Sequence, residues 1–271
     1  MRESRDEGEG EKMLASGVSF VGRRSNNEDT FRVCRDLGLY LVADGMGGHE
    51  GGEVASRLAA EAVTRFFAGK RDGTNPAIDL DDPTRAFRHR MNLAIRQAQR
   101  EVEAAARGDL AEMGTTLAAL WLRGPLAIVA HVGDSRVYRL RGGSLTRLTV
   151  DHSFVAELES AGAHGLLAAL PGDFSAMVTR CLAPAANAQP DISVHPTEPG
   201  DIFLLCSDGL TDVLEDDEIA EILDGWDGAE AAAHELTRAA YEAGSQDNIT
   251  AVVVHADAAT ATDAVEGRIQ A

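Results

Sequence analysis

The feature that most constrains the fold is a series of short apolar runs, typical of strands, separated by loops and turn sequences. Connections such as Arg123-Gly124-Pro125 and Gly142-Gly143 are short enough to bring consecutive strands together as an antiparallel meander. We therefore expect mainly antiparallel sheets, with strands at residues 17–21, 30–33, 39–43, 115–122, 126–132, 136–140, 192–195, 202–206 and 249–255.

Helical periodicity interrupts these runs at several places. Apolar residues recur three and four positions apart within 55–66, and Gly69 ends that helix. The pair Asp82-Pro83 is typical of a helix start, and the apolar stripe that follows continues to Gly108. Shorter helices are expected at 151–162, 217–223 and 229–243.

The chain is expected to form one α+β domain. No linker or internal repeat divides it, and hydrophobic residues make up 44% of the sequence, which is enough for a substantial core. We assign the domain to residues 14–256, between a flexible leader at 1–13 and a flexible tail at 257–271. Residues 70–83 are expected to form a loop, and 163–190 show no firm pattern apart from a short run at 177–182.

The charge of the chain argues against nucleic-acid and membrane binding. Twenty-five basic and 44 acidic residues give a net charge of −19, which repels phosphates and anionic lipid surfaces. No apolar run approaches the roughly 18 residues that span a bilayer. Cys34, Cys181 and Cys206 form no CxxC pair. We expect a cytoplasmic protein without membrane insertion.

Two expected strands end in the dipeptide Asp-Gly, at Asp44-Gly45 and Asp208-Gly209. Each dipeptide alone is a common turn sequence. Asp247, two residues before the last strand, would reach the same end of the sheets. Carboxylates that converge without basic partners repel one another unless cations neutralise them. The absence of adjacent histidines and of cysteine pairs favours Mg²⁺ or Mn²⁺ over zinc.

Seven motifs occur in order along the chain: GRRSNNED at 22–29, VADGMGGH at 42–49, MGTTL at 113–117, VGDSR at 132–136, LTVDHS at 148–153, CSDGL at 206–210 and QDNIT at 246–250. In these motifs the chain resembles the PP2C family of metal-dependent protein phosphatases, also called the PPM family, in its bacterial form. The resemblance implies a sandwich of two antiparallel β-sheets flanked by helices. It also implies hydrolysis of phosphoserine and phosphothreonine in proteins by a water or hydroxide that bridges two metal ions.

The resemblance implies oxygen ligands for two ions, Mn²⁺ or Mg²⁺. Asp44 would bridge both ions, and Asp208 and Asp247 would complete the first site. The second site would use the Gly45 carbonyl and Glu28, directly or through water. Two such ions lower the pKa of a shared water and polarise phosphoryl oxygens, so that no protein nucleophile is needed.

Four further assignments follow from the resemblance. Asp29 would orient the bridging water, and Arg24 would hold the substrate phosphate with its planar guanidinium. Asp134 would share a weaker third ion with Asp208. His49 has two open roles, because it would either protonate the leaving seryl oxygen or hydrogen-bond a metal-bound carboxylate.

One segment departs from the family pattern. Bacterial relatives usually carry a His-Pro-x-Arg element before a Thr-Arg pair, whereas here Thr179-Arg180 follows the sequence AALPGD at 168–173. The metal positions stay intact, so the departure concerns substrate recognition. Among the remaining histidines, His152 is expected to cap or orient the turn after Thr149.

The expected partners are phosphorylated proteins, either a Ser/Thr kinase or its substrates, and the chain is expected to be a monomer. Two other functions compete. A non-catalytic relative that binds phosphoproteins would lack a metal aspartate, and none is missing. A different two-metal hydrolase, such as a nuclease or a small-molecule phosphatase, would act on DNA or nucleotides instead of a phosphothreonine peptide.

Overall fold

The computed structural model describes residues 14–47, 51–69, 82–163, 174, 177–226 and 228–256. Several expectations fall outside these residues: the leader 1–13, the tail 257–271, His49, most of the loop 70–83 and the divergent sequence at 168–173. None of the helices in the described ranges is both long and apolar enough to cross a membrane.

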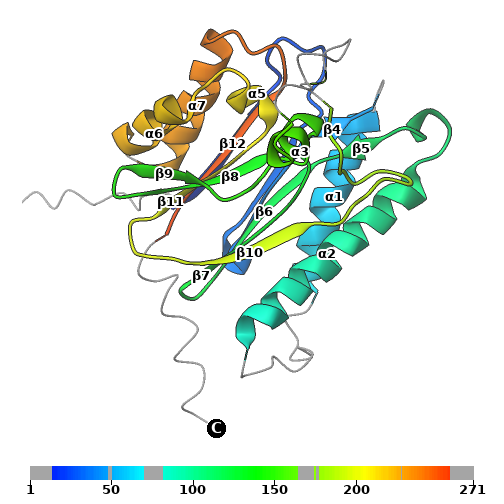
Figure 1. Ribbon diagram of the computed structural model, residues 1–271, viewed down its shortest axis with the longest axis horizontal. Coiled ribbons are helices and arrows are strands. Elements are labelled where there is room, and N and C mark those ends of the chain that lie inside the picture. Colours follow the sequence, from blue (N-terminus) through cyan, green and yellow to red (C-terminus); the bar gives the residue numbers. More distant parts are fainter. Residues whose placement is uncertain are drawn as a thin grey trace, which may run out of the picture.

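Two five-stranded sheets stacked face to face form the body of the fold (Figure 1). All strand pairs within both sheets are antiparallel, as expected. The first sheet has the order β1 (Ala15–Phe20), β12 (Ile249–His255), β11 (Ile202–Cys206), β8 (Arg136–Arg141) and β9 (Ser144–Arg147). The second has the order β10 (Asp191–Pro196), β7 (Leu126–Val132), β6 (Leu117–Arg123), β3 (Leu39–Ala43) and β2 (Thr30–Cys34).

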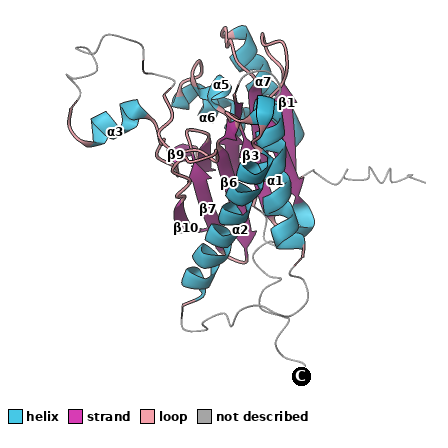
Figure 2. Ribbon diagram, turned by 90° about the vertical axis from the view of Figure 1, so that its right-hand side faces the viewer, coloured by secondary structure: helices cyan, strands magenta, loops and turns pink. Residues whose placement is uncertain are grey.

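Helices cover the outer faces of both sheets, which confirms the expected four-layer sandwich. The long helices α1 (Gly51–Ala68) and α2 (Pro83–Ala105) pack on the second sheet, and α6 (Asp216–Gly225) and α7 (Ala229–Glu242) pack on the first. The start of α2 is as predicted, because the Asp82 side chain accepts hydrogen bonds from the first free backbone amides. Figure 2 shows the short helix α3 (Phe154–Ser160) standing apart from these layers.

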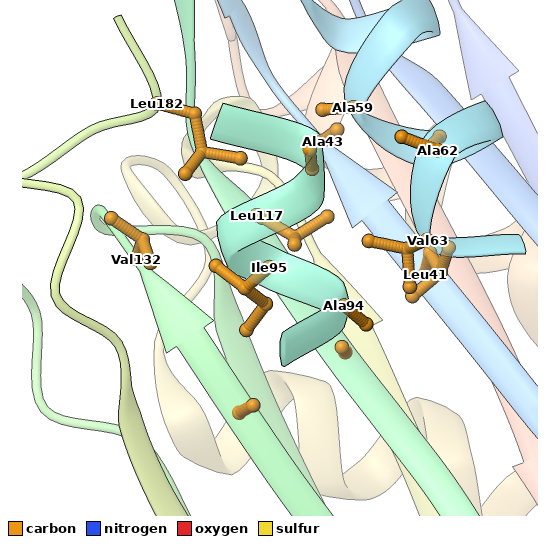
Figure 3. Close-up of a cluster of buried hydrophobic side chains, with 14 of the residues drawn as sticks. Leu41, Ala43, Ala59, Ala62, Val63, Ala94, Ile95, Leu117, Val132 and Leu182 are labelled. Carbon is orange, nitrogen blue, oxygen red and sulfur yellow. The ribbon is translucent and has the colours of Figure 1, made fainter. Parts of the chain in front are cut away.

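Three buried clusters hold the layers together. One lies between the two sheets and includes Val42 and Leu205, and another joins the first sheet to α6 and α7. The largest joins the second sheet to α1 and α2, and Figure 3 shows Ile95 and Leu117 among its side chains. Leu182, from the run predicted at 177–182, is fully buried in this cluster. The loops at the ends of the strands are thus carried by rigid, fully packed layers.

The structure differs from the sequence expectations in several local elements. Strand β9 was not predicted because three of its four residues are exposed, so it carries no apolar alternation. Helix α2 ends at Ala105, before the expected Gly108, which instead begins a 3₁₀ turn. The run at 177–182 forms isolated β-bridges at Val178 and Leu182 and no continuous strand. Two two-residue strands, β4 (Gly45–Met46) and β5 (Gly114–Thr115), pair as a separate small sheet.

Candidate functional site

A cavity of about 380 Å³ lies where loops from both sheets meet. Asp44 follows β3, Asp134 lies between β7 and β8, Asp208 follows β11, and Asp247 precedes β12. The cavity brings together seven of the residues singled out from the sequence: Arg24, Glu28, Asp44, Gly45, Asp134, Asp208 and Asp247. The other described residues of its lining are Asn26, Met46, Gly47, Thr116, Val178 and Asn248. Loops from both sheets therefore bring their acidic residues to one cavity.

The main chain of Asp44 is fixed by the loop that carries Thr116. The Asp44 amide donates to Thr116 Oγ1 at 3.0 Å, and the Asp44 carbonyl accepts from the Thr116 amide at 2.9 Å. Thr115 Oγ1 donates to the same carbonyl at 2.8 Å. Because these bonds use only the main chain of Asp44, its carboxylate remains available to the cavity. Sequence reasoning assigned no role to Thr116, although it lies in the motif MGTTL.

Asp208-Gly209 forms the start of a helix, not the isolated turn that its composition allows. Asp208 is the first residue of α5 (Asp208–Thr211), and its carbonyl accepts from the Asp212 amide at 2.8 Å. A Cβ atom on Gly209 would lie 2.0 Å from the carbonyl oxygen of Asn248. Only glycine therefore lets the loop before β12 approach α5, which places Asp247 beside Asp208.

Asn248 is a second residue whose role the sequence did not reveal. Its Nδ2 donates to the carbonyls of Val21 and Asn26, each at 2.9 Å, and its Oδ1 accepts from the Glu28 amide at 2.8 Å. These three bonds attach the loop that carries Arg24 and Glu28 to the start of β12. An asparagine after a candidate ligand in the motif QDNIT is the only sequence signal that could have identified it.

Arg24 forms an ion pair with one of the candidate ligands. Its Nη2 lies 2.6 Å from Asp247 Oδ2, while the side chain of Arg24 is 57% exposed. The expectation that the carboxylates gather without a basic partner is therefore wrong for Asp247. It holds for Asp44, Asp134 and Asp208, for which the described residues provide no ion pair.

Burial and mutual repulsion raise the pKa values of the grouped carboxyls. Desolvation, followed by repulsion from Asp29, Asp208 and Asp134, raises the pKa of Asp44 well above its usual value. Desolvation and repulsion from Asp208 raise the pKa of Asp134 to about 7. Desolvation and repulsion from Asp212 raise the pKa of Asp208 to about 6. A cation that binds among these carboxyl groups would therefore replace the protons that they hold at their raised pKa values.

Two carboxylate oxygens provide a direct test of whether cations fit this site. Asp208 Oδ1 and Asp29 Oδ1 are buried and have no hydrogen-bond partner among the described residues. Buried polar atoms are normally paired, so such atoms call for a missing partner. Asp208 lines the acidic cavity, and an oxygen-binding cation such as Mg²⁺ or Mn²⁺ bound there would satisfy both its free oxygen and the excess charge. The donor set therefore fits divalent cations.

Asp29 lies behind the cavity and does not line it. Its Oδ2 accepts hydrogen bonds from Ser207 Oγ at 2.8 Å and from Thr250 Oγ1 at 2.6 Å. Burial raises its pKa to about 7, with smaller contributions from Asp208 and Asp247. Its described contacts tie the ends of β11 and β12 together, and the water-orienting role stays a prediction.

The described hydrogen bonds of His152 do not cap the turn after Thr149, and its alternative role of orienting that turn stays a prediction. Its Nδ1 instead accepts a hydrogen bond from the Gly133 amide at 3.1 Å. The Thr149 hydroxyl accepts from the amide of Val137 at 3.2 Å. His152 thus contacts Gly133, the residue before Asp134.

Comparisons with known proteins agree with this arrangement. A family model described as protein phosphatase 2C matches residues 16–257. The serine/threonine protein phosphatase PstP of Mycobacterium tuberculosis H37Rv is 39% identical over 230 residues, which cover 85% of this chain and 42% of that protein. The chain thus spans less than half the length of this relative. The serine/threonine phosphatase stp of Listeria monocytogenes serovar 1/2a is 33% identical. That match covers 86% of this chain and 92% of the Listeria protein.

Solved structures of relatives have the same fold. A crystal structure of the Mycobacterium tuberculosis serine/threonine phosphatase PstP/Ppp aligns with a TM-score of 0.76 and 34% identity, covering 90% of this chain and 98% of that one. The catalytic domain of PstP in complex with two manganese ions aligns with a TM-score of 0.73 and 34% identity, covering 89% and 96%.

Proposed function

Because this chain belongs to the protein phosphatase 2C family, we propose that it hydrolyses phosphoserine and phosphothreonine in proteins with the help of divalent cations. The observation that carries this proposal is the convergence of Asp44, Asp208 and Asp247 on one cavity, with a buried Asp208 oxygen that has no hydrogen-bond partner in the described part of the chain. The manganese-bound structure of the related PstP domain supports the choice of metal.

The cavity residues divide into two proposed ligand groups. Asp44 would hold both ions, Asp208 and Asp247 would hold the first, and the Gly45 carbonyl and Glu28 would hold the second. Bound there, the pair of cations supplies a water of lowered pKa and polarises the phosphoryl oxygens. The amide and carbonyl of Asp44 are both hydrogen-bonded to Thr116, so the backbone that carries its carboxylate is fixed before the cations bind.

Asp134 is the proposed ligand of a weaker third ion, together with Asp208. Both residues line the same cavity, and repulsion from Asp208 contributes to the raised pKa of Asp134. Asp29 would orient the attacking water. His49 keeps its two proposed roles, either as proton donor to the leaving oxygen or as a hydrogen-bond partner of a ligand.

Arg24 is the proposed phosphate-binding residue. Its guanidinium is largely exposed at the cavity and is held by the Asp247 carboxylate and by the Gln246 carbonyl at 3.3 Å. An arginine already oriented toward a carboxylate presents the planar fork that phosphate oxygens also match. The remaining donors of the guanidinium would bind the substrate phosphate beside the ions.

The proposal includes Mn²⁺ or Mg²⁺ as cofactor and a bacterial Ser/Thr kinase whose phosphoprotein products are the substrates. Its test is hydrolysis of a phosphothreonine peptide, DNA and a nucleotide by the same Mn²⁺-loaded protein. Hydrolysis of the peptide alone supports the proposal. Hydrolysis of DNA or the nucleotide in preference to the peptide rejects it, and binding of the peptide without turnover indicates a non-catalytic relative.

A further inference from the structure

A second group of polar residues lies outside the carboxylate cavity. It consists of His131, His152 and Asp191, whose potential metal-binding atoms lie within 4.8 Å of one another. It is the one such group found among the described residues. Both histidines are only 4% exposed. The proposed reaction uses neither of them, so their arrangement needs its own explanation.

The hydrogen bonds of this group do not suit a metal ion. The two imidazole rings stack with centroids 4.4 Å apart and planes inclined by 19°, so their nitrogens lie in nearly parallel planes and do not converge. His152 Nδ1 accepts from the Gly133 amide at 3.1 Å, which leaves the ring proton on Nε2. That Nε2 lies 3.2 Å from Asp191 Oδ2. A protonated nitrogen has no lone pair for a cation.

His152 instead connects three parts of the chain. Its amide donates to the Gly133 carbonyl at 3.0 Å, so backbone and ring together form a closed pair of bonds with Gly133. Its own carbonyl accepts from the Thr179 amide at 2.8 Å. Asp191 on β10 receives the Nε2 proton and also pairs with Arg180 at 3.1 Å. Every polar atom of His152 is therefore engaged.

The turn that His152 holds is the one that carries Asp134. Gly133 has φ of +106°, and a Cβ atom there would lie 2.6 Å from Thr116 Cγ2, so the turn has little freedom on that side. Beyond Asp134, the hydroxyls of Ser135 and Thr116 lie 2.6 Å apart. One end of the turn is thus fixed by His152 and the other by Thr116.

We propose that His152 is a positioning residue for Asp134, and that Asp191 keeps its imidazole in the tautomer that accepts the Gly133 amide. The inference rests on the proposed function, because Asp134 matters as a ligand only if the cavity binds divalent cations. Hydrogen-bonded groups behind metal ligands typically change metal affinity about 10- to 100-fold when removed.

The test compares two substitutions whose side chains have the same number of heavy atoms. In His152→Asn the amide Oδ1 takes the place of Nδ1 and still accepts the Gly133 amide, whereas His152→Leu leaves that amide without an acceptor. His195→Leu is the matched control, since the imidazole of this β10 histidine bonds Ser193 of its own strand, at 2.7 Å, and no loop of the cavity among the described residues. Mn²⁺ binding is followed by isothermal titration calorimetry, and hydrolysis of a phosphothreonine peptide is measured separately.

We expect His152→Leu to weaken the weakest Mn²⁺ site about tenfold while the two tighter sites keep their affinities. His152→Asn should stay within about threefold of the wild type. In the background of Asp134→Asn, which removes the weak site, His152→Leu should cause no further change in Mn²⁺ binding. Equal losses in the Leu and Asn variants, or an unchanged weak site in His152→Leu, would overturn the proposal.

Asp191→Ala keeps the test decisive if the buried leucine variant does not fold. The Asp191 side chain is 55% exposed, so we expect the fold to tolerate its removal, which takes away the acceptor of the Nε2 proton. We expect the weak site to lose a few-fold in affinity, and no loss in this variant would count against the proposal. Wild-type protein that binds no Mn²⁺ would refute the proposed function itself, whereas normal binding and hydrolysis with unaffected variants would refute only the role of His152.

Discussion

Replacing Asp208 by asparagine should stabilise the metal-free protein while abolishing its response to Mn²⁺. Asp208 lies among Asp44, Asp212 and Asp247, and its Oδ1 is buried without a partner in the described structure. In the absence of cations, its negative charge is therefore a cost of folding. The amide of Asp208→Asn has nearly the same shape and carries no charge.

The magnitude follows from the shift in pKa. Desolvation, with repulsion from Asp212, raises the pKa of Asp208 from 3.8 to about 6, and this shift of roughly two pH units corresponds to about 3 kcal/mol above pH 6. The buried amide of asparagine is itself incompletely paired, which reduces the gain to about 1–2 kcal/mol. Wild-type protein at 100 times the dissociation constant for Mn²⁺ should gain about 2.7 kcal/mol, a gain that the variant loses.

The assay is urea unfolding of wild type and variant at pH 7.5, in chelator and in Mn²⁺. Asp224→Asn, at an exposed aspartate of α6, is the matched control. It should change neither the stability in chelator nor the stabilisation by Mn²⁺. Asp208→Asn should also lose hydrolysis of a phosphothreonine peptide. A variant that is less stable than the wild type in chelator, or that keeps the Mn²⁺ stabilisation, would refute the reasoning.

Three further predictions concern the same site. Arg24→Ala should raise KM about tenfold with kcat little changed, because the lost charge-assisted bonds act on bound phosphate, and equal falls in kcat and kcat/KM would argue against this. Since the pKa of Asp134 is raised to about 7, the folded metal-free protein binds this proton more tightly than the unfolded chain does. The stability of the metal-free protein should therefore fall from pH 4 to 7. Urea unfolding that shows higher stability at pH 7.5 than at pH 5 would contradict this. Gly209→Ala would place a Cβ 2.0 Å from the Asn248 carbonyl and should lower the free energy of unfolding by about 1–3 kcal/mol. The control Gly225→Ala, with no atom within 4 Å of its Cβ, should not destabilise the fold in the same unfolding assay.

The layers of the fold were predictable because burial leaves a clear signature in the sequence. Strands such as β3 and β7 consist almost entirely of buried apolar residues, and α2 begins at a recognisable cap. Strand β9 was not predictable, since it lies at the sheet edge with mostly exposed residues and is fixed by pairing with β8. Edge strands of this kind depend on tertiary pairing and not on their own pattern.

The candidate ligands were also accessible from the sequence, whereas the residues that hold them were not. Asp44 and Asp208 follow buried strands, and few other positions in the chain combine such a place with a carboxylate that can bind a metal ion. Asn248 and His152 act through hydrogen bonds to main-chain groups far away in the chain, which no local spacing encodes. The ion pair between Arg24 and Asp247 spans 223 positions and needed the folded structure for the same reason.

The most direct test of the proposed chemistry is the rate of phosphothreonine peptide hydrolysis by metal-stripped protein as Mn²⁺ is added back. The grouped carboxylates should give no turnover in chelator, with activity restored as Mn²⁺ fills the two tighter sites. Full hydrolysis of the peptide in the presence of chelator would contradict the account.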